Sequence, residues 1–192
     1  MKVIGLTGGI ASGKSTISKL LKEKGAVIID ADKIARDLMQ PGKDAWCEVI
    51  SHFGERILKS GGDINRKKLG EIVFHDESQL EVLNNITHPR IKKEIINQLN
   101  YYKEQQADVI VIDAPLLLEI GLDILVDEVW LVVVNEETQI KRLLKREPGM
   151  TVQQAIERIK AQMPLEEKMK YAHRIIDNNG SIEETKKQLE NI

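Results

Sequence analysis

The clearest chemical signal in this sequence is a glycine-rich segment that ends in lysine and serine. Residues 8–15 read Gly-Gly-Ile-Ala-Ser-Gly-Lys-Ser and match the pattern GxxxxGK[ST]. Glycines let backbone N–H groups turn inward around a phosphate, and the helix that follows adds about half a positive charge at its N-terminus. Lys14 can reach the β- and γ-phosphates of a nucleotide, and the Ser15 hydroxyl can bind Mg²⁺.

The flanking residues favour this interpretation over an ordinary glycine-rich turn. An apolar run at 3–6 precedes the segment, and a helical pattern at 16–24 follows it, which is the strand, loop and helix context that the motif requires. We therefore expect ATP to be bound by the loop and the first turn of the helix: Gly8, Gly9, Ile10, Ala11, Ser12, Gly13, Lys14, Ser15 and Thr16.

Acidic residues follow two further apolar runs. Asp30 and Asp32 come after residues 26–29, and Asp113 comes directly after residues 109–112. Ligands of open parallel sheets bind beyond the carboxyl ends of the strands, so these carboxylates belong near the phosphate loop. We expect Asp113 to hold Mg²⁺ through water, although an aspartate that starts the turn before Pro115 is an alternative.

Asp32 is our candidate for the group that orients an attacking hydroxyl and accepts its proton. Phosphoryl transfer has a loose transition state, so an aspartate of ordinary pKa serves by taking the proton late. We rank Asp32 above Asp30 on the expectation that strand geometry continues through these residues and points Asp30 to the other face.

Cations for the transferred phosphoryl group come from one basic helix. Arg142 and Arg146 lie four residues apart, on one face of a helix predicted to start after Asn135 and to end near residue 146. They fit a lid over the triphosphate, and a solvated basic face is the alternative. His88 precedes Pro89, which favours an extended conformation at the start of a helix; capping or packing is a better interpretation than a ligand role.

The apolar runs and helical patterns alternate along the chain. Strands are predicted at 3–6, 26–29, 109–112, 129–134 and 174–176, and helices at 16–24, 136–146, 152–162 and after 181. The fold class is therefore α/β, a mostly parallel five-stranded sheet covered by helices on both faces.

Some 75 residues separate the second and third predicted strands, far more than one crossover needs. Helical patterns at 33–39, 44–53, 66–74, 78–85 and 90–102 fill this interval. It is predicted to be a helical insertion.

Composition excludes several classes of function. The chain of 192 residues carries a net charge of −2 and one cysteine, Cys47. This balance does not point to nucleic acid or an anionic membrane, and a single cysteine excludes an internal disulfide. No signal peptide or 18-residue apolar run is visible, so we expect a cytoplasmic protein, and a monomer by default.

The sequence resembles the dephospho-coenzyme A kinases, a family of P-loop kinases. The matching segments follow the order of that family and cover nearly the whole chain: 5–15, 29–36 with the pattern DAD-x-x-AR, 87–91 with the pattern HP-x-I, 113–122, 139–146 and 161–178. The resemblance implies ATP-dependent phosphorylation of the ribose 3′-hydroxyl of dephospho-CoA, the last step of coenzyme A biosynthesis. It also implies Mg²⁺ as cofactor.

The resemblance assigns further residues and boundaries. It makes Asp32 the catalytic aspartate, Arg142 and Arg146 lid arginines, and Asn178 and Asn179 neighbours of the adenine. The acceptor side would comprise Asp32, Arg36, His88, Pro89, Asp113, Pro115, Leu116 and Glu119. The implied regions are a core of 1–32, 107–138 and 172–192, a CoA-binding insertion of 33–106, and a lid of 139–171. Ala11 and His173 depart from residues that are common in the family, Gly and Asp.

Three other functions compete with this interpretation. The nearest is a P-loop kinase for another small acceptor, such as a nucleoside or nucleotide. A nucleotide switch would need a guanine-reading NKxD segment after the fourth strand, where Asn-Glu-Glu-Thr stands at 135–138. A module that holds ATP without chemistry is disfavoured by Asp32 and the two lid arginines.

Overall fold

The structure is a computed structural model that describes residues 1–190. The chain divides into two compact units, and each is described by itself below. The first unit comprises Met1–Ile29 together with the chain from Tyr101 onward, and the second comprises Asp30–Asn100.

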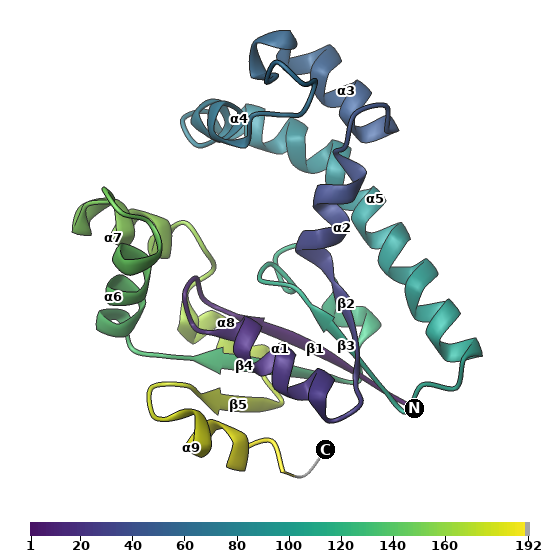
Figure 1. Cartoon of the computed structure of the whole chain (residues 1–192), viewed down its shortest axis with the longest axis vertical. Coiled ribbons are helices and arrows are strands. Elements are labelled where there is room, and N and C mark those ends of the chain that lie inside the picture. Colours follow the sequence, from purple (N-terminus) through teal and green to yellow (C-terminus); the bar gives the residue numbers. More distant parts are fainter. Residues whose placement is uncertain (191–192) are drawn as a thin grey trace. The chain divides into compact units, whose positions relative to one another are not determined.

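The first unit is built on a five-stranded sheet (Figure 1). Its strands are β1 (Lys2–Gly8), β2 (Val27–Asp30), β3 (Val109–Asp113), β4 (Glu128–Val133) and β5 (Arg174–Asp177), in the order β2-β3-β1-β4-β5. β1 pairs in parallel with β3 and β4, and β4 pairs in parallel with β5. The predicted parallel sheet is confirmed, and β1, which carries the phosphate loop, lies at its centre.

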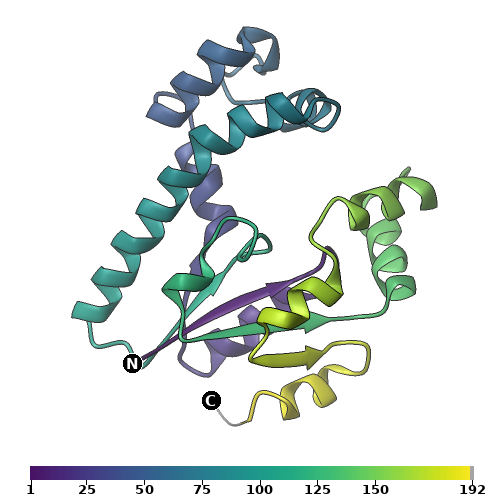
Figure 2. The same ribbon diagram turned by 180° about the vertical axis from the view of Figure 1, so that it is seen from behind.

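Helices cover both faces of this sheet. The helices that lie wholly in this unit are α1 (Lys14–Glu23), α6 (Glu136–Arg146), α7 (Val152–Lys160), α8 (Leu165–Tyr171) and α9 (Ile182–Lys187), of which α6 and α7 pack on each other beyond the end of β4 (Figure 1). α1 lies in front of the sheet in Figure 1, whereas α8 lies in front of it in the reverse view of Figure 2. Ile17 and Leu21 of α1 pack with Ile4, Leu6 and Trp130 of the strands in a core from which water is excluded.

The sequence prediction did not include α8. Its ends nevertheless carry helix signals, because Pro164 precedes it, Glu166 and Glu167 occupy its first turn, and Lys168 and Lys170 lie in its last. These charges complement the helix dipole. The helix was missed because its 7 residues are too few to show a hydrophobic period.

The second unit is helical, as expected of the insertion. It contains α2 (Ala31–Leu38), α3 (Asp44–Phe53), α4 (Arg66–Val73) and most of α5 (Glu77–Glu104). Its core is formed mainly by Val49 and Phe53 of α3 with Leu69 and Val73 of α4. None of the helices within residues 1–190 is long and apolar enough to cross a membrane.

The prediction of two helices separated at His88 and Pro89 was wrong. α5 runs through both residues, with Pro89 inside it. A proline in a helix removes one N–H donor, and side chains here donate to carbonyl groups of the adjoining turns. Thr87 Oγ1 donates to the carbonyl of Leu83 at 2.9 Å, and Arg90 Nη1 donates to that of Ile86 at 2.6 Å.

The prediction that strand geometry continues from Asp30 to Asp32 was also wrong. Strand geometry ends at Asp30, because α2 begins at the next residue and Asp30 is its N-cap, accepting from the backbone N–H of Lys33 at 2.8 Å. Residues two apart on a strand would in any case share a face. The Asp30 side chain caps the helix terminus, and Asp32 lies exposed in the first helical turn.

Candidate active site

The phosphate loop joins β1 to α1 and requires an unusual backbone at its end. Gly13, the N-cap residue of α1, has φ 87°, in the left-handed region that favours glycine. A Cβ atom at Gly13 would also collide with the side-chain amide of Asn178. The sequence motif therefore places a glycine where both the backbone and the neighbouring side chain demand one.

Donors from the loop itself and from later parts of the chain bind the carbonyl oxygens of the loop. Arg142 donates from Nη1 to the carbonyls of Ala11 at 3.3 Å and Ser12 at 3.1 Å. Asn178 Nδ2 donates to the carbonyl of Ser12 at 2.8 Å, and Arg142 Nη2 donates to that of Asn178 at 3.0 Å. These contacts hold the negative ends of the loop dipoles on protein donors, which leaves the loop suited to an anion.

Lys14 and Asp113 meet beside the loop. The Lys14 ammonium donates to Asp113 Oδ1, and both side chains are largely buried. Register places Asp113 opposite Leu6 of β1, which explains why the end of β3 reaches the loop. Residues 1–190 contain no group of three His, Cys, Asp or Glu that could hold a metal. A site with one carboxylate and the Ser15 hydroxyl suits Mg²⁺, which keeps several waters and takes phosphate oxygens as ligands.

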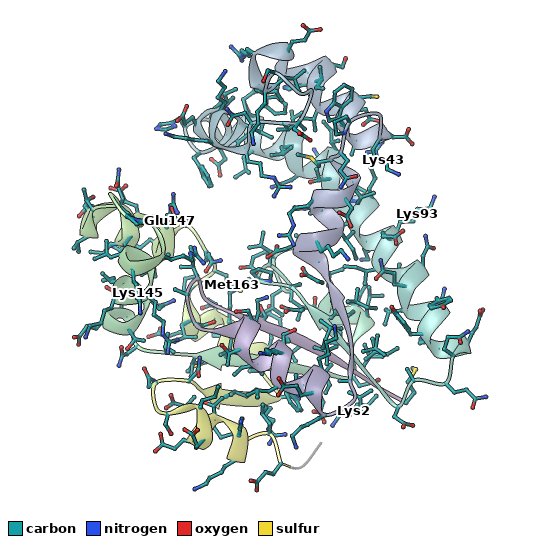
Figure 3. All side chains as sticks on the ribbon, in the orientation of Figure 1. Lys2, Lys43, Lys93, Lys145, Glu147 and Met163 are labelled. Carbon is teal, nitrogen blue, oxygen red and sulfur yellow. The ribbon has the colours of Figure 1, made fainter. Side chains whose placement is uncertain are left out.

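The two candidate lid arginines have different surroundings. Arg142 lies at the loop, whereas the Arg146 side chain is 58% exposed and its guanidinium pairs with Glu147 at 3.4 Å. Glu147, labelled in Figure 3, also accepts two bonds of 2.7 Å from Arg158 of α7. These bonds lower the pKa of Glu147 and tie the end of α6 to α7. The structure brings Arg142, but not Arg146, to the phosphate loop.

The segment after β3 is fixed by a lysine that sequence reasoning missed. Lys168 of α8 is 1% exposed, pairs with Glu119 at 2.8 Å and donates to the carbonyl of Pro115 at 3.0 Å. The same carbonyl accepts from Thr7 Oγ1 at 3.1 Å. Pro115 and Glu119 are thereby held in place, and Leu116 between them is 40% exposed. Only the structure reveals Lys168, because nothing in the sequence distinguishes it from Lys170, the other lysine of its helix.

The remaining acceptor candidates belong to the second unit. Asp32 and Arg36 both lie on α2, where the Arg36 guanidinium pairs with Asp30 at 3.8 Å. His88 lies within α5, and burial lowers the pKa of its imidazole, so the ring is neutral near pH 7.

The segment after β5 contains the two candidate adenine neighbours. Asn178 is buried and contacts the loop, whereas Asn179 is exposed and accepts from the backbone N–H of Asn135 at 2.9 Å. His173, just before β5, accepts from the backbone N–H of Val129 at 3.1 Å through Nδ1, so its contact is structural.

Ala11 adopts a conformation that costs free energy. Its φ of 59° lies in the left-handed region, which costs a residue with a Cβ atom about 1–2 kcal/mol. We expect Ala11→Gly to raise the free energy of unfolding by about 1 kcal/mol, because glycine adopts this conformation without that strain. Urea denaturation checks the value, with Ala45→Gly in the buried part of α3 as a control that should destabilise instead. Unchanged or lower stability of Ala11→Gly would contradict the strain.

These features define the class of P-loop kinases. They are a phosphate loop between the central strand and the first helix, a lysine and an aspartate beside that loop, and a pair of helices that carries arginines. The chain belongs to the dephospho-CoA kinase family, whose sequence model matches residues 2–184. It is 53% identical to the dephospho-CoA kinase of Carboxydothermus hydrogenoformans over 189 residues, which cover 98% of this chain and 91% of that protein.

Solved structures agree with this assignment. A Thermus thermophilus protein superposes with a TM-score of 0.83 and 31% identity, covering 98% of this chain and 94% of that one. The dephospho-CoA kinase from Campylobacter jejuni gives a TM-score of 0.70 and 30% identity, covering 97% and 92%. The resemblance noted from the sequence is confirmed.

Proposed function

We propose that this kinase transfers the γ-phosphoryl group of ATP to the ribose 3′-hydroxyl of dephospho-CoA, giving coenzyme A and ADP. The observation that carries the proposal is the contact of Lys14 with Asp113 beside an intact phosphate loop, in a chain whose family assignment covers residues 2–184. The identity of the acceptor is inferred from the family, and the transfer of a phosphoryl group is inferred from the phosphate loop.

In the proposed reaction the 3′-oxygen attacks the γ-phosphorus in line with the leaving group. A bond forms between that oxygen and phosphorus, the bond from phosphorus to the β,γ-bridging oxygen breaks, and the hydroxyl proton passes to the Asp32 carboxylate. Lys14 and the loop N–H groups hold the β- and γ-phosphates. The acceptor would be bound by Arg36, His88, Pro89 and the segment from Asp113 to Glu119. The adenine of ATP would lie near Asn178 and Asn179.

Arg142 and Arg146 are proposed to act on the triphosphate to different degrees. Arg142 donates hydrogen bonds to carbonyl groups of the loop and so supports the loop conformation that binds phosphate. Arg146 has an exposed side chain, held only at the surface by Glu147, and would pair with the transferred group.

Ser15 and Asp113 would hold Mg²⁺, which when bound neutralises charge on the β- and γ-phosphates. We expect chelation by EDTA to reduce turnover to background, because Lys14 and the lid arginines are proposed to act together with the charge of the metal and not in its place. ADP release in EDTA, and again after excess MgCl₂ is restored, measures this. A full rate in EDTA would contradict the proposed metal dependence.

An acceptor panel tests the substrate. ADP release is measured with Mg·ATP and dephospho-CoA, adenosine, AMP or shikimate in turn. Strong stimulation by dephospho-CoA alone is the expected result. Turnover on another member of the panel, without stimulation by dephospho-CoA, would overturn the proposed acceptor and leave the phosphate-loop chemistry in place.

A further inference from the structure

Ile10 in the phosphate loop has both of its backbone polar groups bonded by glutamine side chains. Its N–H donates to Gln162 Oε1 at 2.6 Å, and its carbonyl accepts from Gln139 Nε2 at 2.8 Å. Gln139 lies on α6. Gln162 lies just after α7 and directly before Met163, which is labelled in Figure 3. The two ends of the α6–α7 pair therefore hold one residue of the loop between them.

The chemistry of the two contacts fixes the orientation of each amide. A backbone N–H needs an acceptor and a carbonyl needs a donor, so Gln162 must present its oxygen and Gln139 its nitrogen. Gln139 and Gln162 also line a cavity of about 360 Å³ beside Gly9 and Ser12. Both side chains are half-buried, where a hydrogen bond that is lost is not fully replaced by water.

The glutamine contacts complete the set of bonds on the loop carbonyls. The carbonyl of Gly9 accepts from the backbone N–H of Ser12 at 3.1 Å, and those of Ala11 and Ser12 accept from Arg142. With Gln139 on Ile10, each carbonyl from Gly9 to Ser12 has a protein donor. Carbonyl oxygens repel phosphate oxygens, so holding them on protein donors keeps these oxygens turned away from a bound phosphate.

The next residue explains why such support is needed. Ala11 is held in the left-handed region, which an alanine leaves readily when its neighbours are free. The peptide groups on either side of Ala11 are bonded by Gln139 and by Arg142, both on α6.

We propose that Gln139 and Gln162 are positioning residues that hold Ile10, and with it Ala11, in the phosphate-binding conformation. This rests on the proposed function in that it concerns ATP binding at the same loop. It assigns the α6–α7 pair a role in forming the loop, in addition to any role in covering bound ATP.

The first test needs no substrate. Exchange of the Ile10 amide proton is followed by NMR in the nucleotide-free protein, with ¹⁵N-labelled isoleucine. Gln162→Ala should speed this exchange roughly tenfold, because it removes the acceptor. Gln162→Glu should restore slow exchange, since a carboxylate accepts the same bond. Wild-type exchange in Gln162→Ala would overturn the proposal.

The partner glutamine should respond in the opposite way to the same replacement. Gln139→Glu has no proton to donate, so it should fail to keep the bond to the Ile10 carbonyl, and the ¹³C shift of that carbonyl should move as in Gln139→Ala. Gln153→Ala, at an exposed glutamine of α7 that bonds Glu157, is the matched control and should leave both signals unchanged. The proposal would also be overturned if Gln139→Glu and Gln162→Glu both kept, or both lost, the hydrogen bond to Ile10.

The second test measures ATP binding by calorimetry and then steady-state kinetics. Gln139→Ala and Gln162→Ala should each weaken ATP roughly tenfold, raising the KM for ATP while leaving the KM for the acceptor unchanged. A loss of turnover at saturating ATP with unchanged affinity would count against positioning. If dephospho-CoA is not the acceptor, the proposed function fails while the exchange and affinity results still decide this inference.

A substitution on the loop side provides an independent check. A Cβ atom at Gly9 would lie 2.7 Å from Gln139 Nε2, so Gly9→Ala should displace that amide from Ile10. Combined with Gln139→Ala, it should weaken ATP no further than either change alone. Additive losses would show that the two substitutions act separately and would overturn the assigned role of Gln139.

Discussion

Asp32→Asn should lose most turnover while binding ATP as the unmodified protein does. Asparagine keeps the size and polarity of the side chain but cannot accept the proton of the acceptor hydroxyl. General bases of this kind contribute about 10²- to 10⁴-fold to a rate, so we expect kcat to fall within that range. Single-turnover kinetics measure the rate, and calorimetry with ATP in the absence of acceptor measures the retained affinity.

Helix α2 supplies a matched control for this experiment. Asp37 lies on the same helix, is exposed, and only approaches Gln40 at 3.5 Å, so Asp37→Asn should leave kcat unchanged. Asp30→Ala is a second comparison, because Asp30 caps the helix through a side-chain oxygen and the loss of that cap should lower stability rather than the chemical rate. Near-normal turnover in Asp32→Asn would refute the assignment of Asp32.

Lys14→Ala should weaken ATP binding and slow the chemical step together. The ammonium is the cation of the loop, and its removal takes charge stabilisation from both the bound and the reacting triphosphate. Loss of one such preorganised donor costs about 10²- to 10³-fold in kcat, and a rise in the KM for ATP should accompany it. Steady-state kinetics over a wide ATP range separate the two effects.

The substitution also removes the partner of a buried carboxylate. Asp113 is 10% exposed and loses its ion pair with Lys14, so thermal denaturation should show lower stability as well. Lys19→Ala, at a side chain of the same helix that is 78% exposed, should change neither kinetics nor stability. Unchanged kinetics in Lys14→Ala would show that the loop does not bind the triphosphate as proposed.

The parts of this molecule that the sequence predicted are those specified by neighbouring residues. Residues 8–15 define the loop by consecutive residue types, and the continuous apolar runs at 109–112 and 129–134 define buried parallel strands. The capping boxes at Thr151 and Ser181, which start α7 and α9, are local in the same way, because both partners of each lie within four residues.

The parts that the sequence could not predict depend on groups brought together from far apart. Pro89 would end an isolated helix, but Arg90 donates to a backbone carbonyl of α5 and pairs with Glu48 of α3. Gln139 and Gln162 carry no charge and belong to no sequence motif, so no neighbouring residue indicates that they contact Ile10. The same holds for Lys168, whose partners lie about 50 residues earlier in the chain.

The anchors of the phosphate loop have a consequence for synthesis on the ribosome. The loop is made before its side-chain partners, which lie at positions 139, 142, 162 and 178, and the bond from Asn178 to Ser12 spans 166 residues. Chains grow at about 5–20 residues per second, so the loop waits on the order of ten seconds for its last partner. The nascent chain therefore gains the full set of contacts on its phosphate loop only after residue 178 has been made.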